Sequence, residues 1–206
     1  MEMDDMLESV MNYMSYFGEV DKRIIEAMKF IDRKKFYPFM DEAYNDIPLE
    51  IGKEQTISQP STVGRMLQLL KLEKGNSCLE IGAGSGWLAA LLAYIVKPGH
   101  VVSFEFHPEL VDFARKNIGG FNLTNLKIEE QDFLELLQSY DRIIFSCGIE
   151  KDEEKEIEEW VFSHLKENGV CIVPFREGPL LIFEKIKGKL KMTRTREEYT
   201  FAPLLK

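Results

Sequence analysis

Apolar residues recur at helical spacing in two stretches near the start of the chain. The first stripe comprises Met3, Met6, Leu7, Val10, Met11 and Met14, and the second comprises Ile24, Ile25, Ala27, Met28 and Ile31. These stripes predict two amphipathic helices, the first of which ends near Gly18. A methionine-rich stripe of this kind is typical of a packing face.

The following stretch has no helical period. The segment Phe36–Pro38 breaks the pattern, and residues 39–60 are punctuated by Pro48, Gly52 and Pro60. We therefore expect residues 39–60 to be irregular. A structureless stretch of this length inside a compact domain is usually functional.

From residue 62 onward, strand and helix patterns alternate. Helices are expected over 62–72, 87–96, 108–118 and 153–166, with a short one near 133–138, and strands over 77–81, 101–106, 126–130, 142–146 and 170–175. Repeated strand–helix units predict a mostly parallel sheet with helices on both faces. Residues 180–187 and 190–196 predict an antiparallel hairpin at one edge. The pattern indicates a Rossmann-like α/β fold with N-terminal helices and a C-terminal hairpin.

Length and charge narrow the class of protein. The 206 residues suit one structural domain, with residues 1–60 packed on a core formed by residues 61–206. The formal net charge of −9 argues against nucleic acid as a partner, because phosphate binding needs a basic surface. Neither a signal peptide nor a membrane-spanning apolar run is evident, so we expect a cytoplasmic protein with no membrane partner. We also expect a monomer.

The three cysteines carry no metal signature. Cys78, Cys147 and Cys171 form no C-x-x-C pair, and no histidine stands at ligand spacing from them. Cys78 and Cys171 fall in apolar strand patterns, which is typical of small core residues in a reducing compartment. We therefore expect no metal site.

A glycine-rich turn directly follows one predicted strand. Leu79-Glu80-Ile81 leads into Gly82-Ala83-Gly84-Ser85-Gly86, and a helix begins at Trp87. This arrangement is typical of nucleotide-binding sheets, whose ligands lie at the carboxyl ends of the strands. The G-x-G-x-G spacing places Trp87 where a dinucleotide pattern needs glycine, which argues against NAD.

Three acidic residues accompany the turn. Glu80 is placed to attract a cationic ligand end, such as an amino group or a sulfonium. Glu105 ends the second strand, where a carboxylate accepts bonds from both ribose hydroxyls, with Phe106 beside it. Asp132 follows the third strand and either accepts a bond from an adenine amino group, with Phe133 beside the ring, or caps a helix. The set points to S-adenosylmethionine.

Segments on both sides of the glycine loop share a further pattern. They are Ile31–Pro38, Ala43–Leu49, Gln55-Thr56-Ile57-Ser58-Gln59-Pro60, Leu79–Gly86, Pro108–Leu110, Ala114-Arg115, Lys166, Gly169, Pro174 and Phe201-Ala202-Pro203-Leu204. Together they resemble the protein-L-isoaspartate O-methyltransferases over most of the chain. The run from Gln55 to Pro60 is the most specific of these matches. Taken without the resemblance, it is a loop entering a helix, with Ser58 or Ser61 as the cap.

The resemblance implies a class I methyltransferase fold and a repair reaction. A methyl group would pass from S-adenosylmethionine to the free carboxylate of an isoaspartyl residue, leaving S-adenosylhomocysteine. The methyl ester would then cyclise to a succinimide, whose hydrolysis returns some normal aspartyl linkage. The partners implied are damaged proteins and peptides that contain isoaspartate.

The resemblance also assigns roles to residues. The catalytic residues are Ser58 and Thr56; the substrate-binding residues are Gln55 and Ile57; the cofactor-binding residues are Glu80, Gly82, Ala83, Gly84, Ser85, Gly86, Glu105, Phe106, Asp132 and Phe133. Two alternatives stay open from the residues themselves. One is a methyltransferase with a different acceptor, and the other is a binding module that keeps the cofactor, or has lost it, without catalysis.

Overall fold

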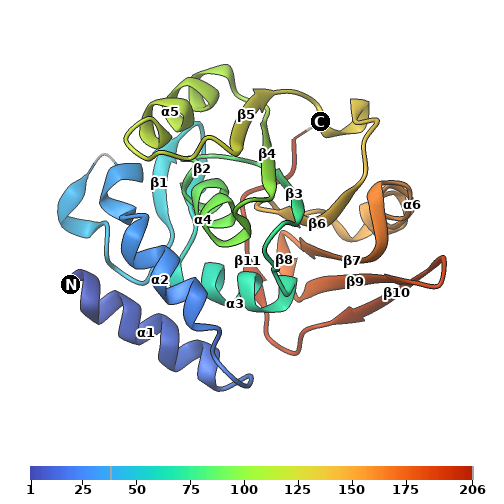
Figure 1. Ribbon diagram of the computed structural model, residues 1–206, viewed down its shortest axis with the longest axis horizontal. Coiled ribbons are helices and arrows are strands. Elements are labelled where there is room, and N and C mark those ends of the chain that lie inside the picture. The colour runs from blue at the N-terminus through green and yellow to red at the C-terminus, as the bar shows by residue number, and fades with distance from the viewer. Residues whose placement is uncertain (38, 206) are drawn as a thin grey trace.

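A seven-stranded sheet forms the centre of the molecule (Figure 1). The structure is a computed structural model that describes residues 1–37 and 39–205, so Pro38, part of the expected helix break, lies outside the described residues. The strands lie in the order β10-β9-β7-β6-β3-β4-β5, with the bounds β3 (Ser77–Ile81), β4 (His100–Glu105), β5 (Leu126–Glu130), β6 (Tyr140–Phe145), β7 (Leu165–Pro174), β9 (Leu180–Ile186) and β10 (Lys189–Arg194).

The strand directions confirm the expected topology. Strands β3 to β7 pair in parallel, whereas β9 pairs antiparallel with both β7 and β10. All of β3 is buried, while β10, at one edge, exposes Lys189 and Lys191. A parallel strand covered on both faces has no solvent side and so reads as a continuous apolar run. The sequence pattern therefore predicted the bounds of β3, β4, β5 and β6 to within two residues, whereas β7 begins at Leu165 and not at the predicted residue 170.

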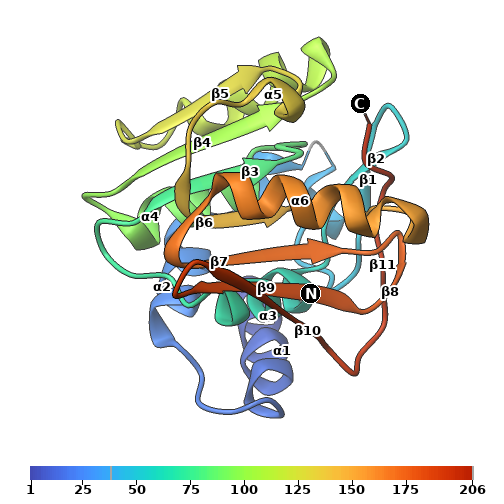
Figure 2. The same cartoon turned by 90° about the vertical axis from the view of Figure 1, so that its right-hand side faces the viewer.

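Six α-helices and four short 3₁₀ turns lie within the described residues. The helices are α1 (Met3–Ser15), α2 (Lys22–Phe30), α3 (Pro60–Leu70), α4 (Trp87–Val96), α5 (Pro108–Ile118) and α6 (Glu154–His164), and the turns are η1 (Arg33–Phe36), η2 (Met40–Glu42), η3 (Phe133–Glu135) and η4 (Lys151–Glu153). Figures 1 and 2 show α6 on one side of the sheet and α1 to α4 on the other. The expected helices on both faces are thus present.

The core divides between the two faces of the sheet. Successive strand residues point to opposite faces, so Ile144 joins the cluster under α1 to α4 while Ile143 and Phe145 join the cluster under α6. The N-terminal helices belong to the first cluster. Helix α1 approaches α3 so closely that a Cβ at Gly64 would come within 2.7 Å of Val10. One detail of the expected methionine stripe is wrong, because Met11 is 40% exposed.

The expectation that residues 39–60 are irregular is wrong. This segment contains η2 and an antiparallel hairpin of β1 (Leu49–Gly52) and β2 (Gln55–Ile57). Lys53 and Glu54 form the turn, with φ angles of 56° and 59°. Two-residue hairpin turns need positive φ, which glycine and asparagine adopt most readily. A Lys-Glu pair carries no such signal, so the hairpin is invisible in the sequence pattern.

The C-terminal segment returns to the carboxyl ends of the central strands. Strands β8 (Glu177–Gly178) and β11 (Tyr199–Thr200) form a small antiparallel sheet. Beyond it, the amide of Gly148 donates to the carbonyl of Ala202 at 2.7 Å, and the amide of Leu204 donates to the carbonyl of Gly148 at 2.8 Å. Residues 202–204 therefore lie beside the loop that follows β6.

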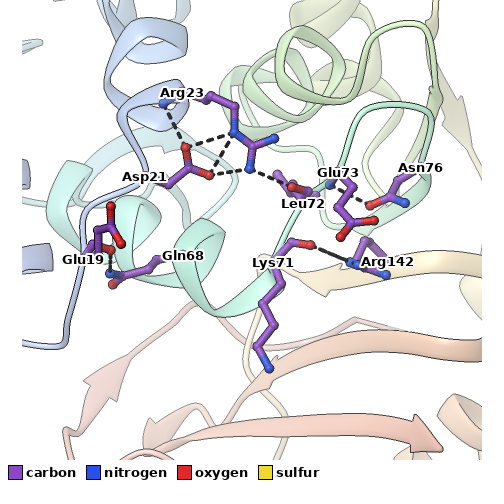
Figure 3. A network of polar contacts seen from close by, with 9 residues as sticks. All are labelled: Glu19, Asp21, Arg23, Gln68, Lys71, Leu72, Glu73, Asn76 and Arg142. Atoms are coloured by element: carbon purple, nitrogen blue, oxygen red, sulfur yellow. Dashed lines mark hydrogen bonds and ion pairs between the residues drawn. The ribbon is translucent and has the colours of Figure 1, made fainter.

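A polar network secures the opposite end of the sheet (Figure 3). Helix α3 ends at Leu70, its C-cap residue Lys71 is in the left-handed conformation, and the carbonyls at this helix end need partners. Arg142 of β6 donates twice to the carbonyl of Lys71, at 3.0 and 3.1 Å, and Arg23 donates to the carbonyl of Leu72 at 2.8 Å. Asp21 holds Arg23 in place and caps α2. The network joins α2, the end of α3 and β6.

Candidate active site

The glycine loop bridges β3 and α4 at the carboxyl edge of the sheet. Gly82, Gly84 and Gly86 have φ angles of 93°, 52° and 84°, a region that favours glycine. A Cβ at Gly86 would lie 3.1 Å from the Cβ of Ala114, so the loop also packs tightly on α5. The amides of Gly82 and Ala83 both donate to the carbonyl of Phe104, at 2.8 and 3.0 Å. The loop is thereby fixed to the end of β4.

Ser85 completes the turn without facing open solvent. Its hydroxyl accepts a bond from the amide of Trp87 at 3.3 Å, and its carbonyl accepts one from Asn117 at 2.9 Å. Both contacts fix the start of α4 and its distance from α5. The residues from Gly82 to Gly86 therefore form a rigid floor whose backbone is free of large side chains.

Glu105 stands next to this floor. One of its carboxylate oxygens accepts a bond from the amide of Gly84 at 2.8 Å, and the other accepts one from the amide of His107 at 3.0 Å. The side chain is 6% exposed. Each carboxylate oxygen has a further lone pair. Glu105 is therefore held in a fixed orientation and can still accept two hydroxyl donors from a ligand.

Glu80 lies deeper, with no exposed surface. Its carboxyl oxygens accept bonds from the hydroxyls of Ser103, at 2.6 Å, and Ser146, at 2.8 Å. Burial raises the pKa of Glu80 to about 8; the two hydroxyl bonds oppose the rise, and the charge of Glu105 adds to it. A positive charge brought beside this carboxyl would favour its ionised form.

Two narrow hollows adjoin the glycine loop. The residues that line the outer hollow include Phe106, His107, Asp132, Phe133 and Leu204. Those that line the inner hollow include Thr56, Ser58, Glu80, Gly84 and Trp87. Four residues line both hollows: Gln55, Gly82, Glu105 and Cys147. Each has a cavity volume of about 40 Å³ and is partly open to solvent.

The structure places Asp132 and Phe133 at the wall of the outer hollow. Asp132 also caps η3, because its carboxylate accepts a bond from the amide of Leu134 at 2.9 Å. The helix-cap interpretation of this residue is confirmed, and the cofactor role stays a prediction. Phe133 is 2% exposed and packs edge-to-face against Phe145 and Trp160, so most of its ring belongs to the core. Phe106, by contrast, is 49% exposed.

Residues 55–58 lie between the inner hollow and a larger groove. Thr56 and Ser58 line the inner hollow and also an open groove of about 620 Å³, whose other walls include Lys151, Glu177 and Tyr199. Ile57 points inward, is 2% exposed and pairs with Leu49 across the hairpin. Strand β2 and the residue after it thus form a wall between the inner hollow and the groove, and this wall carries the hydroxyls of Thr56 and Ser58.

Neither Ser58 nor Ser61 caps the helix that follows. Gln59 is the N-cap residue and makes no capping bond through its side chain, while Asp46 accepts a bond from the amide of Ser61 at 2.9 Å. The capping interpretation of the two serines is therefore wrong. A cap supplied from 15 residues upstream has no local sequence signal, since such signals assume a cap residue at the helix start.

Several residues at the site escaped the sequence prediction. Cys147 borders both hollows, with its sulfur 3.7 Å from the carbonyl of Ile81, and burial raises the pKa of its thiol. Gln131, Leu204 and Leu205 line the outer hollow, and Ala202 lines the inner one. The match at Phe201–Leu204 was the only signal for the C-terminal residues, because nothing local shows that this segment returns to the sheet.

The residues present suit S-adenosylmethionine. The two hollows share lining residues, and around them lie the open backbone from Gly82 to Gly86, the fixed acceptor Glu105, the carboxyl of Glu80 and the exposed ring of Phe106. The open backbone lets a ligand approach closely, and Glu105 can accept bonds from ribose hydroxyls. Glu80 suits the cationic end of the methionine part, and the Phe106 ring suits the adenine base. Within the described part of the chain, no group of three or more His, Cys, Asp or Glu side chains is arranged to hold a metal ion.

Curated proteins similar to this chain share one description. A protein-L-isoaspartate O-methyltransferase of Fervidobacterium nodosum is 40% identical over 181 residues, which are 85% of this chain and 88% of that protein. One of Thermosipho melanesiensis is 39% identical over 174 residues, 82% of this chain and 85% of the other.

Solved structures support the fold. One, from Plasmodium falciparum and described as a putative protein-L-isoaspartate O-methyltransferase in complex with S-adenosyl-L-homocysteine, has a TM-score of 0.84, 22% identity, and covers 100% of this chain and 99% of its own. Another, described as a protein-L-isoaspartate O-methyltransferase, has a TM-score of 0.80, 27% identity, and covers 98% of this chain and 65% of its own.

The match also extends to a whole family. The protein-family model described as Protein-L-isoaspartate(D-aspartate) O-methyltransferase matches residues 4–206, nearly the full length of the chain. The glycine loop with its two carboxylates agrees with a methyl donor, and the similarity to curated relatives exceeds 30% identity over more than two thirds of their length. The chain therefore belongs to the protein-L-isoaspartate(D-aspartate) O-methyltransferase family.

Proposed function

We propose that this chain transfers a methyl group from S-adenosylmethionine to the free carboxylate of L-isoaspartyl residues in damaged proteins. The observation that carries the proposal is the position of Thr56 and Ser58, which line both the inner hollow beside the glycine loop and the open groove of about 620 Å³. A donor on one side and a peptide on the other would meet at these two hydroxyls.

The donor side would be held by residues of the sheet edge. Glu105 would accept the ribose hydroxyls, Asp132 and Phe106 would border the base, and Glu80 would face the cationic end of the methionine part. The backbone of Gly82–Gly86 would lie against the ligand. S-adenosylmethionine supplies the electrophilic methyl group when bound.

The acceptor needs little activation. A carboxylate is already anionic at neutral pH, so no strong base is required. Thr56 and Ser58 would donate hydrogen bonds that hold the acceptor oxygen in line with the methyl group, with Gln55 and Ile57 shaping the wall. Alignment of this kind accounts for much of the rate of transfer reactions.

Ser58 would position the acceptor rather than attack it. A serine nucleophile needs an adjacent base, and the hydrogen bonds of the described residues include no histidine bonded to Ser58. The thiol of Cys147 is also unsuited to attack, since burial raises its pKa and keeps it protonated.

Further expectations are proposed with this function. Residues 1–60 would carry the acceptor loop on a core, residues 61–206, that binds the donor. Over the described residues, no helix has the length and apolar character needed to cross a membrane. With three buried free cysteines and a net charge of −9, we propose a cytoplasmic monomer that acts on proteins and not on nucleic acid.

The direct test is methyl transfer from radiolabelled S-adenosylmethionine to an isoaspartyl peptide and to its aspartyl twin. We expect base-labile label on the isoaspartyl peptide alone, because a methyl ester is hydrolysed by base. Binding of S-adenosylhomocysteine without transfer to the isoaspartyl peptide would refute this acceptor and favour another acceptor or a binding role.

Two substitutions separate the roles of the site. Ser58→Ala should reduce kcat about tenfold or more and leave the Kd for S-adenosylhomocysteine within about twofold, because it removes only a positioning bond. Glu105→Ala should weaken that binding by about tenfold or more, because it removes a charged acceptor of hydroxyl bonds. Isothermal titration calorimetry measures the Kd for S-adenosylhomocysteine, and initial-rate kinetics measures kcat. Equal loss of cofactor affinity in the two variants would contradict these roles.

A further inference from the structure

A buried arginine lies behind the wall that carries Thr56 and Ser58. Arg33, the first residue of η1, has no exposed surface. None of the ion pairs within the described residues involves the Arg33 guanidinium. Burial lowers the pKa of Arg33 to about 10, so the side chain stays cationic at neutral pH. A buried charge of this kind is costly unless other groups solvate it.

Main-chain carbonyls solvate the two terminal nitrogens of the guanidinium, whereas its Nε is buried without a hydrogen-bond partner among the described residues. One terminal nitrogen donates to the carbonyl of Ala43 and, at 3.4 Å, to that of Asn45. The other donates to the carbonyls of Ile47 at 3.2 Å, Ile57 at 3.4 Å and Ser58 at 3.0 Å. The guanidinium therefore joins two separate segments, residues 43–47 and the end of β2.

The bonds to Ile57 and Ser58 act on the site itself. The carbonyls before and after the Ser58 Cα both point at one cation, which fixes the two peptide planes that flank this residue. Because the direction of Cα–Cβ follows from those planes, the cation also fixes where the Ser58 Cβ lies, and its hydroxyl can occupy only the χ1 positions around that atom. Thr56 directly precedes Ile57 on β2, so the bond to the Ile57 carbonyl also restrains the strand that carries Thr56.

The same guanidinium contacts the donor side. Its central carbon lies 5.3 Å from the ring centroid of Trp87, which begins α4 directly after the glycine loop and lines the inner hollow. The Trp87 indole nitrogen donates to the carbonyl of Ile31, two residues before the arginine, at 3.1 Å. The Arg33 guanidinium thus contacts the first residue of α4 through the Trp87 ring, and its hydrogen bonds hold the backbone of residues 57 and 58.

We propose that Arg33 is a positioning residue that sets the Ser58 and Thr56 hydroxyls relative to the glycine loop. This inference rests on the methyl transfer proposed above. The guanidinium touches neither donor nor acceptor, and it acts through the backbone of residues 57 and 58. Lysine cannot replace it, because one ammonium cannot reach carbonyls on two segments with a planar fork.

The test compares Arg33→Lys with a matched control, Arg142→Lys. Arg142 is also a buried arginine that donates to main-chain carbonyls, those of Lys71 and Asp141, but it lies at the opposite end of the sheet. For each variant we would measure kcat and KM for an isoaspartyl peptide, the Kd for S-adenosylhomocysteine and the Tm, at temperatures well below unfolding.

Arg33→Lys should lower kcat by about tenfold or more and leave the Kd for S-adenosylhomocysteine within about threefold. Arg142→Lys should lower Tm and leave kcat within about twofold. In Arg33→Ala, added guanidinium ion at non-denaturing concentration should restore part of the lost kcat, and Arg142→Ala should gain nothing from it. Full kcat in Arg33→Lys, or equal loss of kcat in both lysine variants, would overturn the proposal.

Amide hydrogen exchange tests the role of Arg33 without depending on which acceptor is methylated. In Arg33→Lys, amides of residues 43–61 should exchange faster than in the wild-type protein, whereas Arg142→Lys should leave them unchanged. If the wild-type protein methylates no isoaspartyl peptide, the proposed function fails, and the exchange result decides the role of Arg33. Unchanged exchange over residues 43–61 would then refute it.

Discussion

At the scale of single residues, Glu80 shows how a fold can hold a carboxyl in an unfavourable place. The side chain stands on a fully buried strand, opposite Ser103 on β4, and its two oxygens accept only hydroxyl bonds. Burial raises its pKa to about 8, against an ordinary value of 4.5. A residue that costs stability yet borders the inner hollow is more consistent with ligand binding than with folding.

The cost of Glu80 should depend on pH. Its folded pKa is raised, so its contribution to stability is fully present below about pH 4.5 and is lost as pH rises through about 8. Glu80→Gln carries no charge at any pH. Between pH 5 and pH 8, the wild-type free energy of unfolding should fall relative to this variant by on the order of a few kcal/mol.

Urea unfolding of both proteins at several pH values measures this difference. A difference between the two proteins that stays constant from pH 5 to pH 8 would show that Glu80 titrates normally in the fold. Other titrating groups are common to both proteins, so they cancel in the comparison.

At the scale of elements, the hairpin β1–β2 lies across the glycine loop and is tied down at its tip. Lys53 forms an ion pair with Glu109 of α5 at 2.5 Å, and its bond lowers the pKa of that carboxyl. A Cβ at Gly84 would lie 3.4 Å from the side chain of Ile51. The hairpin therefore covers part of the glycine loop, and its tip contact restrains it there.

Lys53→Ala should therefore change kinetics more than stability. Both partners of the ion pair are largely exposed, so we expect no measurable change in Tm. The dissociation rate of S-adenosylhomocysteine should increase by about twofold to fivefold, because the tip loses its contact with α5. Stopped-flow displacement measures this rate.

A matched control comes from α6, where Lys155 and Glu159 form an exposed pair remote from the hairpin. Lys155→Ala should leave the dissociation rate unchanged. Identical rates in the wild-type protein and Lys53→Ala would mean that the ion pair does not restrain the hairpin.

At the scale of the whole molecule, the donor site joins parts that are distant in the chain. Its walls come from the hairpin β1–β2, the glycine loop, the ends of β4, β5 and β6, and the C-terminal residues 202–205. A ligand that touches all of them stabilises the native state as one unit, because the unfolded chain has no such site.

S-adenosylhomocysteine should therefore raise the Tm of the full chain. At a concentration of 100 times its Kd the added stability should be about 2.7 kcal/mol. Differential scanning calorimetry measures the shift. Glu105→Ala should lose about half of it or more at the same ligand concentration, while Ser58→Ala should keep nearly all of it. A full shift in Glu105→Ala would contradict the placement of the ligand.

The order of strands and helices from residue 62 onward could be predicted from the sequence alone. β3, α4, α5 and β5 have the predicted bounds, because buried parallel strands and amphipathic helices each impose a local period of apolar residues. The glycine loop was visible for a similar reason, since positive φ at Gly82, Gly84 and Gly86 selects one residue type.

Only the tertiary structure decided what depends on distant contacts. The turn at Lys53 and Glu54 adopts a strained backbone that its residues do not signal. Asp46 caps a helix that begins at Pro60, and the guanidinium of Arg33 holds the carbonyls of Ile57 and Ser58. A local pattern records the period and the φ requirement of nearby residues, whereas these bonds join segments that become neighbours only after the chain has folded.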